Sequence, residues 1–107
     1  MTDRELLKAA AKAAGNPQGR HVALGGLLMA NDLYWNPLTD DGDALRLAVK
    51  LFLFVDSAAG APDSFGAEMV RAGNEVVDAT EPRTHEDPYA ATRRAIVRAA
   101  AEIGRKL

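Results

Sequence analysis

The sequence predicts an α+β fold in which three helices pack on one mostly antiparallel or mixed sheet, an α-β-α, sandwich-like arrangement. Three segments carry apolar residues at helical spacing, and short aliphatic and aromatic runs lie between them. The connections between these runs resemble hairpin turns, which favours antiparallel pairing. With 107 residues, of which 48% are hydrophobic, we expect a single domain over residues 1–107 with one core.

The first predicted helix covers residues 3–14. Thr2 and Glu5 have the spacing of a capping box, in which the hydroxyl accepts from a free amide and the carboxylate reaches back. Gly15 and Pro17 mark the end of the helix. An apolar stripe at helical spacing runs along it, formed by Leu6, Leu7, Ala10, Ala11 and Ala14.

A hairpin is predicted in the apolar region that follows the first helix. Residues 27–30 and 33–35 are apolar, and Asn31 and Asp32 between them tolerate positive φ. An irregular apolar loop is the alternative. Trp35 is the only tryptophan and could anchor a protein partner, but we expect it to pack against the neighbouring helix because tryptophan is usually buried.

The second predicted helix begins after Asp40, whose side chain can accept hydrogen bonds from free amides. Residues 44–51 are apolar on more than one side, so we expect neighbouring elements to cover this helix well. Residues 52–55 are aromatic and β-branched, which predicts a buried strand that ends in a loop over residues 57–64.

A second hairpin is predicted from residues 65–71 and 75–80, with Gly73 in a left-handed position between them. Residues 81–86 read as a charged loop. The last helix begins at Asp87 and Pro88, an N-cap followed by proline at the first helical position. Its predicted buried stripe consists of Tyr89, Ile96, Ala99, Ala100, Ile103 and Leu107.

Composition excludes several kinds of site. The absence of cysteine removes disulfides, thiolate metal sites and cysteine nucleophiles. The net charge of −2 argues against a polycation that binds nucleic acid through overall charge. The N-terminus is charged with mixed sign, and the longest apolar run, residues 51–55, is short, so we expect neither a secretory signal nor a membrane association. We therefore expect a cytoplasmic protein of a bacterium or of a phage-infected host.

The acidic cluster of Asp40, Asp41 and Asp43 could hold a divalent cation, but it lacks the register of a calcium loop, and helix capping accounts for it. His21 and His85 each lie in a polar loop without a second histidine at metal-ligand spacing. We expect both histidines to be solvated and no metal to be bound.

The serines and glycines do not form a catalytic or phosphate-binding motif. Ser57 and Ser64 lack the flanking glycines of a nucleophile elbow. Gly25 and Gly26 lack the lysine and hydroxyl residue of a phosphate-binding loop. We therefore expect no enzyme activity and no cofactor. An enzyme of unknown type, in which His85 would meet acidic groups in a pocket, is the least favoured alternative.

The last helix carries an excess of positive charge over its single acid, Glu102. Such a face could track a phosphate backbone, which makes a nucleic-acid-associated protein the second hypothesis. A solvated outer face, favoured near the C-terminus by the helix dipole, is the simpler interpretation. Together with Trp35, the candidate interaction residues are Arg93, Arg94, Arg98 and Arg105; Lys106 adds a fifth positive charge to the helix.

Two stretches carry a resemblance to a known family. They are residues 35–51, WNPLTDDGDALRLAVKL, and residues 87–105, DPYAATRRAIVRAAAEIGR, and they make up about a third of the chain. The pair resembles a group of small uncharacterised phage and prophage proteins described as a phage ABA-sandwich domain. The resemblance implies helices on both faces of a sheet, and it implies no catalytic residue or cofactor.

The leading functional hypothesis is therefore a phage or prophage accessory protein that acts by contact with a host or phage protein. Self-association is a further expectation, because an exposed hairpin edge could pair across a dimer axis. The chain is accordingly expected to be a monomer or a homodimer.

Overall fold

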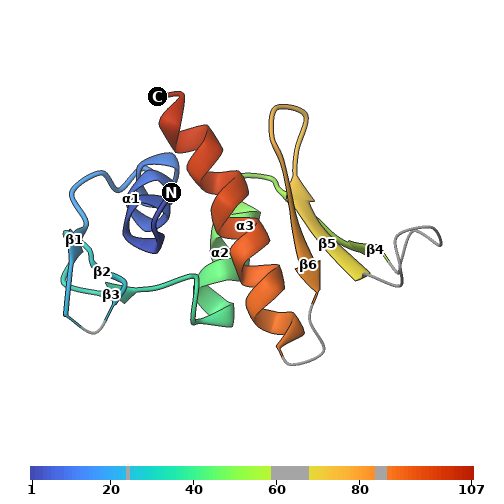
Figure 1. Ribbon diagram of the computed structural model, residues 1–107. Helices are drawn as coiled ribbons and strands as arrows, with labels where there is room; N and C mark the ends of the chain where they lie inside the picture. Colours follow the sequence, from blue (N-terminus) through green and yellow to red (C-terminus); the bar gives the residue numbers. More distant parts are fainter. Residues whose placement is uncertain (24, 59–67, 84–86) are drawn as a thin grey trace.

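The computed structural model describes residues 1–23, 25–58, 68–83 and 87–107, and within these residues it contains three helices and two three-stranded antiparallel sheets (Figure 1). The helices are α1 (Asp3–Ala13), α2 (Asp41–Lys50) and α3 (Pro88–Arg105). The small sheet consists of β1 (Arg20–His21), β2 (Leu27–Leu28) and β3 (Tyr34–Trp35). The large sheet consists of β4 (Phe54–Ala58), β5 (Glu68–Gly73) and β6 (Asp78–Arg83). The predicted α+β class with antiparallel pairing is confirmed.

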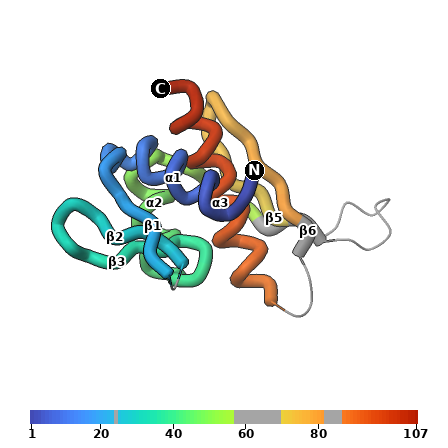
Figure 2. The backbone as a smooth tube through the Cα atoms, turned by 60° about the vertical axis from the view of Figure 1, so that its left-hand side comes forward, coloured from blue at the N-terminus to red at the C-terminus, as the bar shows by residue number. Residues whose placement is uncertain are grey.

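The helices lie between the two sheets. Figure 1 shows the small sheet on one side of the helices and the large sheet on the other, and Figure 2 shows the same order from a turned view. The described strands thus form two sheets, whereas the sequence predicted one. The sheets lie on the outside with the helices between them, whereas the family resemblance implied a sheet with helices on both of its faces. Each sheet is built only from strands adjacent in sequence, because hairpin connections pair neighbours and α2 separates the two sets.

The predicted starts of the three helices are confirmed. The Thr2 hydroxyl accepts from the Glu5 N–H at 3.2 Å, while Glu5 Oε1 accepts from the Thr2 N–H at 3.3 Å, which completes the capping box of α1. Asp40 and Asp87 each accept from the amide three residues later, at 2.7 Å and 2.9 Å. These caps are local interactions, so the sequence alone specifies them.

Small residues allow α1 and α3 to approach closely. Ala10 on α1 is fully buried in the same core cluster as Ala99 and Ala100 of α3. Gly104 on α3 lies directly against Ala9, so that a Cβ at position 104 would overlap the Ala9 carbonyl oxygen. The predicted stripe of α3 is correct in its middle, but Tyr89 near the start of α3 and Leu107 beyond its end are exposed.

The core has two parts. The larger one lies between the helices and the inner face of the large sheet, and the smaller one joins α1 to the small sheet through Leu7, Ala11, Leu27 and Met29. Trp35 is half-buried and packs against both parts, as does Leu38. The prediction that Trp35 packs inside the fold is thus confirmed.

Both predicted hairpins are present, and the second one turns at a different place. In the first, Asp32 has φ of 62° in the turn between β2 and β3. In the second, β5 continues through Gly73, which does not have positive φ, and Asn74 begins the turn by accepting from the Val77 N–H at 3.1 Å. Glycine is needed at position 73 because a Cβ there would overlap the Val77 carbonyl oxygen. Residues 81–83 belong to β6, and residues 84–86 of the predicted loop lie outside the described residues.

The prediction that α2 is well covered is wrong. Its buried residues are Ala44, Leu47 and Ala48, and they face α3 and the large sheet. Leu45 and Val49, on another face, are 63% and 67% exposed. An apolar pattern on two faces indicates two apolar surfaces, but it does not determine how many neighbours are present to cover them.

Candidate functional site

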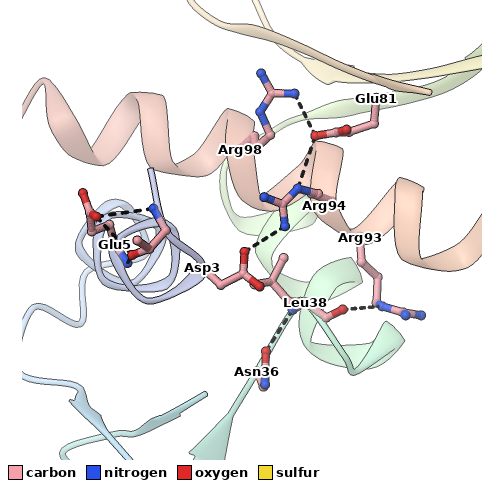
Figure 3. Close-up of polar contacts among 9 residues, drawn as sticks. Asp3, Glu5, Asn36, Leu38, Glu81, Arg93, Arg94 and Arg98 are labelled. Carbon is pink, nitrogen blue, oxygen red and sulfur yellow. Dashed lines mark hydrogen bonds and ion pairs between the residues drawn. The ribbon is translucent and has the colours of Figure 1, made fainter. Parts of the chain in front are cut away.

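Arg93 ties α3 to the segment that leads into α2. Its Nε donates to the Leu38 carbonyl oxygen at 2.8 Å (Figure 3). Its Nη1 pairs with Asp41 Oδ1 at 2.7 Å. The Arg93 side chain is only 15% exposed. Of the four candidate arginines, this one is therefore a structural link between the two stretches that carry the family resemblance.

Arg94 and Arg98 share one carboxylate on the neighbouring strand. Glu81 Oε1 lies 3.5 Å from Arg94 Nε and 2.7 Å from Arg98 Nη1, as Figure 3 shows. Arg94 also pairs with Asp3 at 2.9 Å, which connects α3 to the start of α1. Arg98 Nη1 donates in addition to the Thr80 carbonyl oxygen at 2.9 Å.

The positive charge of the α3 face is therefore largely matched by acids of the same chain. Arg105, the fourth candidate, pairs with Glu102 at 2.8 Å within the helix. A phosphate that bound these guanidinium groups would have to compete with the carboxylates that already accept from them. This face presents less unpaired positive charge than its sequence indicated.

A groove of about 570 Å³ lies between α3, β6 and the N-terminus. Its walls combine apolar residues, such as Leu6 and Ala79, with the ion-paired Arg94, Arg98 and Glu81. The groove thus brings three predicted arginines (Arg94, Arg98 and Arg105) together, but Trp35 is not among its lining residues. Charges of both signs line it, so it does not select for one sign of ligand.

The acidic cluster before α2 is occupied by structural contacts. Asp40 caps the helix, Asp41 pairs with Arg93, and Asp43 Oδ2 accepts from the Asn36 N–H at 2.9 Å. Across the part of the chain that the structure describes, no group of three or more histidine or acidic side chains is placed to hold a metal ion. Helix capping accounts for Asp40, whereas Asp41 and Asp43 are held by contacts with Arg93 and with the Asn36 N–H.

The remaining candidate residues do not meet at a common centre. His21 is half-buried, and its pKa is lowered by burial and by the positive charges of Arg4 and Lys8. Ser57 lies in β4 opposite Val70. His85 and Ser64 lie outside the described residues. The Tyr34 hydroxyl donates to the Gly25 carbonyl oxygen at 2.8 Å, which fixes the loop that contains Gly25 and Gly26.

A different surface stands out, which we call the α2–β4 surface. It consists of five exposed large apolar side chains that lie within residues 45–55, namely Leu45, Val49, Phe52, Phe54 and Val55. Leu45 and Val49 are four residues apart on α2 and therefore lie on the same face of that helix. The sequence shows this apolar pattern, but it predicts a covered helix and a buried strand over residues 52–55. The prediction of a buried strand is wrong: β4 begins only at Phe54, and Phe52, Phe54 and Val55 are exposed.

Phe52 has an unusual conformation at the centre of this surface. The turn that ends α2 is a Schellman motif: the Leu53 N–H donates to the Ala48 carbonyl oxygen at 2.9 Å, and the Phe52 N–H donates to that of Val49 at 3.3 Å. The motif needs a left-handed residue, usually glycine, at position 52. Phe52 occupies it with φ of 55°, and its side chain is 87% exposed.

β4 forms one margin of the large sheet, because the strand order is β4-β5-β6. α3 packs mainly on β5 and β6. Phe54 and Val55 are partly exposed on the margin strand. The Arg71 guanidinium lies 5.5 Å from the centre of the Phe54 ring, which fixes Phe54 on the outer face of the sheet.

Comparison with known proteins gives no relative for this chain: no family model, no curated protein and no solved structure matches it. The resemblance to the phage ABA-sandwich domain therefore stays a prediction from the two stretches that carry it. None of the helices formed by the described residues combines the length and the apolar character needed to cross a membrane.

Proposed function

We propose that this chain is a protein-binding module that acts through the α2–β4 surface. The observation that carries the proposal is Phe52, a large aromatic side chain that is 87% exposed in a backbone conformation that favours glycine. Neither its conformation nor its exposure benefits folding. Strained residues concentrate at functional sites. Four further exposed large apolar side chains lie within seven residues of Phe52 in the sequence.

The setting we propose for this binding is that of a phage or prophage accessory protein, with a host or phage protein as the partner. Its support is the resemblance of residues 35–51 and 87–105. The first stretch contains α2, and Arg93 in the second stretch holds the loop before α2 through Leu38 and Asp41. The two stretches are thus linked, and the first of them carries Leu45 and Val49, two of the five side chains of the proposed binding surface.

A role in nucleic-acid binding has less support. The four arginines of α3 that motivated it all pair with carboxylates of this chain. Salt-dependent binding to nucleic acid requires positive charges that are available to phosphates. The apolar surface, in contrast, has no counterpart in the chain that covers it among the described residues.

The test is site-specific photocrosslinking in lysate of the cell of origin. A photoreactive phenylalanine analogue replaces Phe52 in one variant and Tyr89 in a matched control, because Tyr89 is also an exposed aromatic residue, at 68%, on a different element. We expect a discrete protein adduct from position 52 that is absent from position 89. We also expect the Phe52→Asp variant to recover none of that partner, although the far-UV circular dichroism spectrum of the variant matches that of the wild-type chain. Equal adducts from both positions, or recovery unaffected by Phe52→Asp, would refute the proposed binding surface.

A further inference from the structure

We infer that the partner bound by the α2–β4 surface is a second copy of this chain, with the two β4 strands paired antiparallel across a two-fold axis. This inference rests on the proposed function and specifies its partner. The pairing joins the two large sheets into one six-stranded sheet. In a two-fold contact each surface meets itself, so one patch on each copy is sufficient.

The two margins of the large sheet differ in how they are protected. β6 contains Pro82, which lacks a backbone N–H, and its Glu81 is engaged by Arg94 and Arg98. β4 has neither a proline nor a lysine, and it begins with Phe54 and Val55. An edge strand whose only charged residue is Asp56 can pair with a further strand. Among the described strands of the large sheet, β4 is therefore the edge that is open to pairing.

The sequence of β4 is compatible with pairing to itself. With Val55 on the two-fold axis, the two valines face each other, and Phe54 of each copy lies opposite Asp56 of the other. The Asp56 carboxylates are then not directly opposed, which avoids like-charge repulsion. Val55 shares its face of the sheet with Ala72, its neighbour on β5, and Ala72 is fully buried on the helix side. The two valines therefore meet on the side where the helices lie.

α2 lies at the same end of the sheet as the start of β4. Only Phe52 and Leu53 separate the C-cap of α2 from β4, and Asn74 Nδ2 donates to the Leu51 carbonyl oxygen at 3.4 Å, which holds this junction against the β5–β6 turn. α3 packs mainly on β5 and β6, so the helix layer is thin over β4. In the dimer, apolar side chains of the second copy cover the side of β4 on which α3 does not pack.

The exposed side chains of the α2–β4 surface supply part of the area that a dimer needs. A standard interface buries about 800 Å² per partner. A buried aromatic side chain contributes roughly 150–250 Å². Phe52 and Phe54, with three aliphatic side chains and the open backbone of β4, supply a large part of that area.

The test uses the absence of cysteine in this chain, which makes a single introduced thiol an unambiguous reporter. Val55→Cys places two thiols across the proposed axis, where opposite residues of antiparallel strands are close enough for a disulfide. The matched control is Tyr89→Cys, at an exposed position outside the surface. Sedimentation equilibrium over a concentration series gives the mass of the wild-type chain and of Val55→Lys, which would place two positive charges on the axis.

We expect a wild-type dimer, rapid disulfide-linked dimers for Val55→Cys and not for Tyr89→Cys, and a folded monomer for Val55→Lys. A wild-type monomer, or a dimer in which Val55→Cys crosslinks no faster than Tyr89→Cys, overturns the β4 pairing. If the chain is monomeric and position 52 still crosslinks to a different protein, the dimer is refuted and the proposed binding function stands. If neither occurs, both are refuted.

Discussion

Two helices of this chain end in the same hydrogen-bonded motif, with different residues at its left-handed position. In α1 the Asn16 N–H donates to the Ala11 carbonyl oxygen at 2.8 Å, and Gly15 has φ of 85°. In α2 the same place is taken by Phe52. Glycine adopts this conformation without the steric cost that a Cβ introduces. The pair therefore provides an internal measure of what Phe52 costs the fold.

We predict that Phe52→Gly raises the free energy of unfolding by about 1 kcal/mol, because left-handed geometry costs a residue with a Cβ roughly that amount. Within a single copy of the chain, the exposed ring contributes little burial that could be lost, so the substitution is compared in the Val55→Lys background, which we expect to be monomeric. The measurement is urea unfolding followed by far-UV circular dichroism. The matched control is Gly15→Phe, which has no atom within 4 Å of the added Cβ and should lower stability by a similar amount through the backbone alone. A destabilising Phe52→Gly would show that the ring supports the fold.

At the scale of elements, the capping box of α1 makes helix stability depend on pH. The Thr2 backbone N–H and then the Thr2 hydroxyl donate to the Glu5 carboxylate, and these bonds lower the pKa of Glu5. A carboxyl group with a lowered pKa in the folded state adds stability at pH values above its unfolded pKa. That contribution is lost as the pH falls through the folded pKa.

We therefore predict that Glu5→Gln flattens part of the acid limb of the stability curve. The amide keeps an oxygen that accepts from Thr2, but it does not titrate. Chemical unfolding of both chains over a pH series is the measurement, and the two curves should converge as the pH falls below the ordinary range of glutamate. Parallel curves down to the lowest pH would indicate that the Thr2–Glu5 contact has no role in the acid sensitivity of α1.

At the scale of the whole molecule, Trp35 connects the two parts of the core. It extends from the small sheet and packs against both clusters, one of which includes the inner face of the large sheet. We predict that the tryptophan emission and the far-UV signal report one unfolding transition with the same midpoint, with the emission shifting to the red. Separate midpoints would show that the two sheets unfold independently.

The same contact predicts a large effect of Trp35→Ala, a loss of roughly 3 kcal/mol, because the substitution leaves a cavity between the clusters. Leu33→Ala provides the control on the same hairpin, since Leu33 is exposed; a change of about 0.5 kcal/mol or less is expected there.

Much of the secondary structure could be predicted from the sequence because the signals are local. Thr2, Asp40 and Asp87 cap helices through amides three residues away, and Asn31 and Asp32 mark a turn between adjacent strands. The position of the second turn was missed because Gly73 was assigned to a left-handed turn. It is required instead by the close approach of the Val77 carbonyl oxygen, which involves the opposite strand.

The candidate site was decided by tertiary structure. The arginines of α3 read as a free basic face because their partners, Asp3, Asp41 and Glu81, come from distant parts of the chain. The apolar residues of α2 were likewise expected to be buried, because the sequence does not show which of them another element covers. Local signals in the sequence specify the element types, the helix starts and the presence of apolar faces. The division of the strands into two sheets, and the exposure of one face of α2 and of the β4 edge, depend on tertiary packing. A side chain is buried only where another element lies against it, and that position is not encoded in the local sequence.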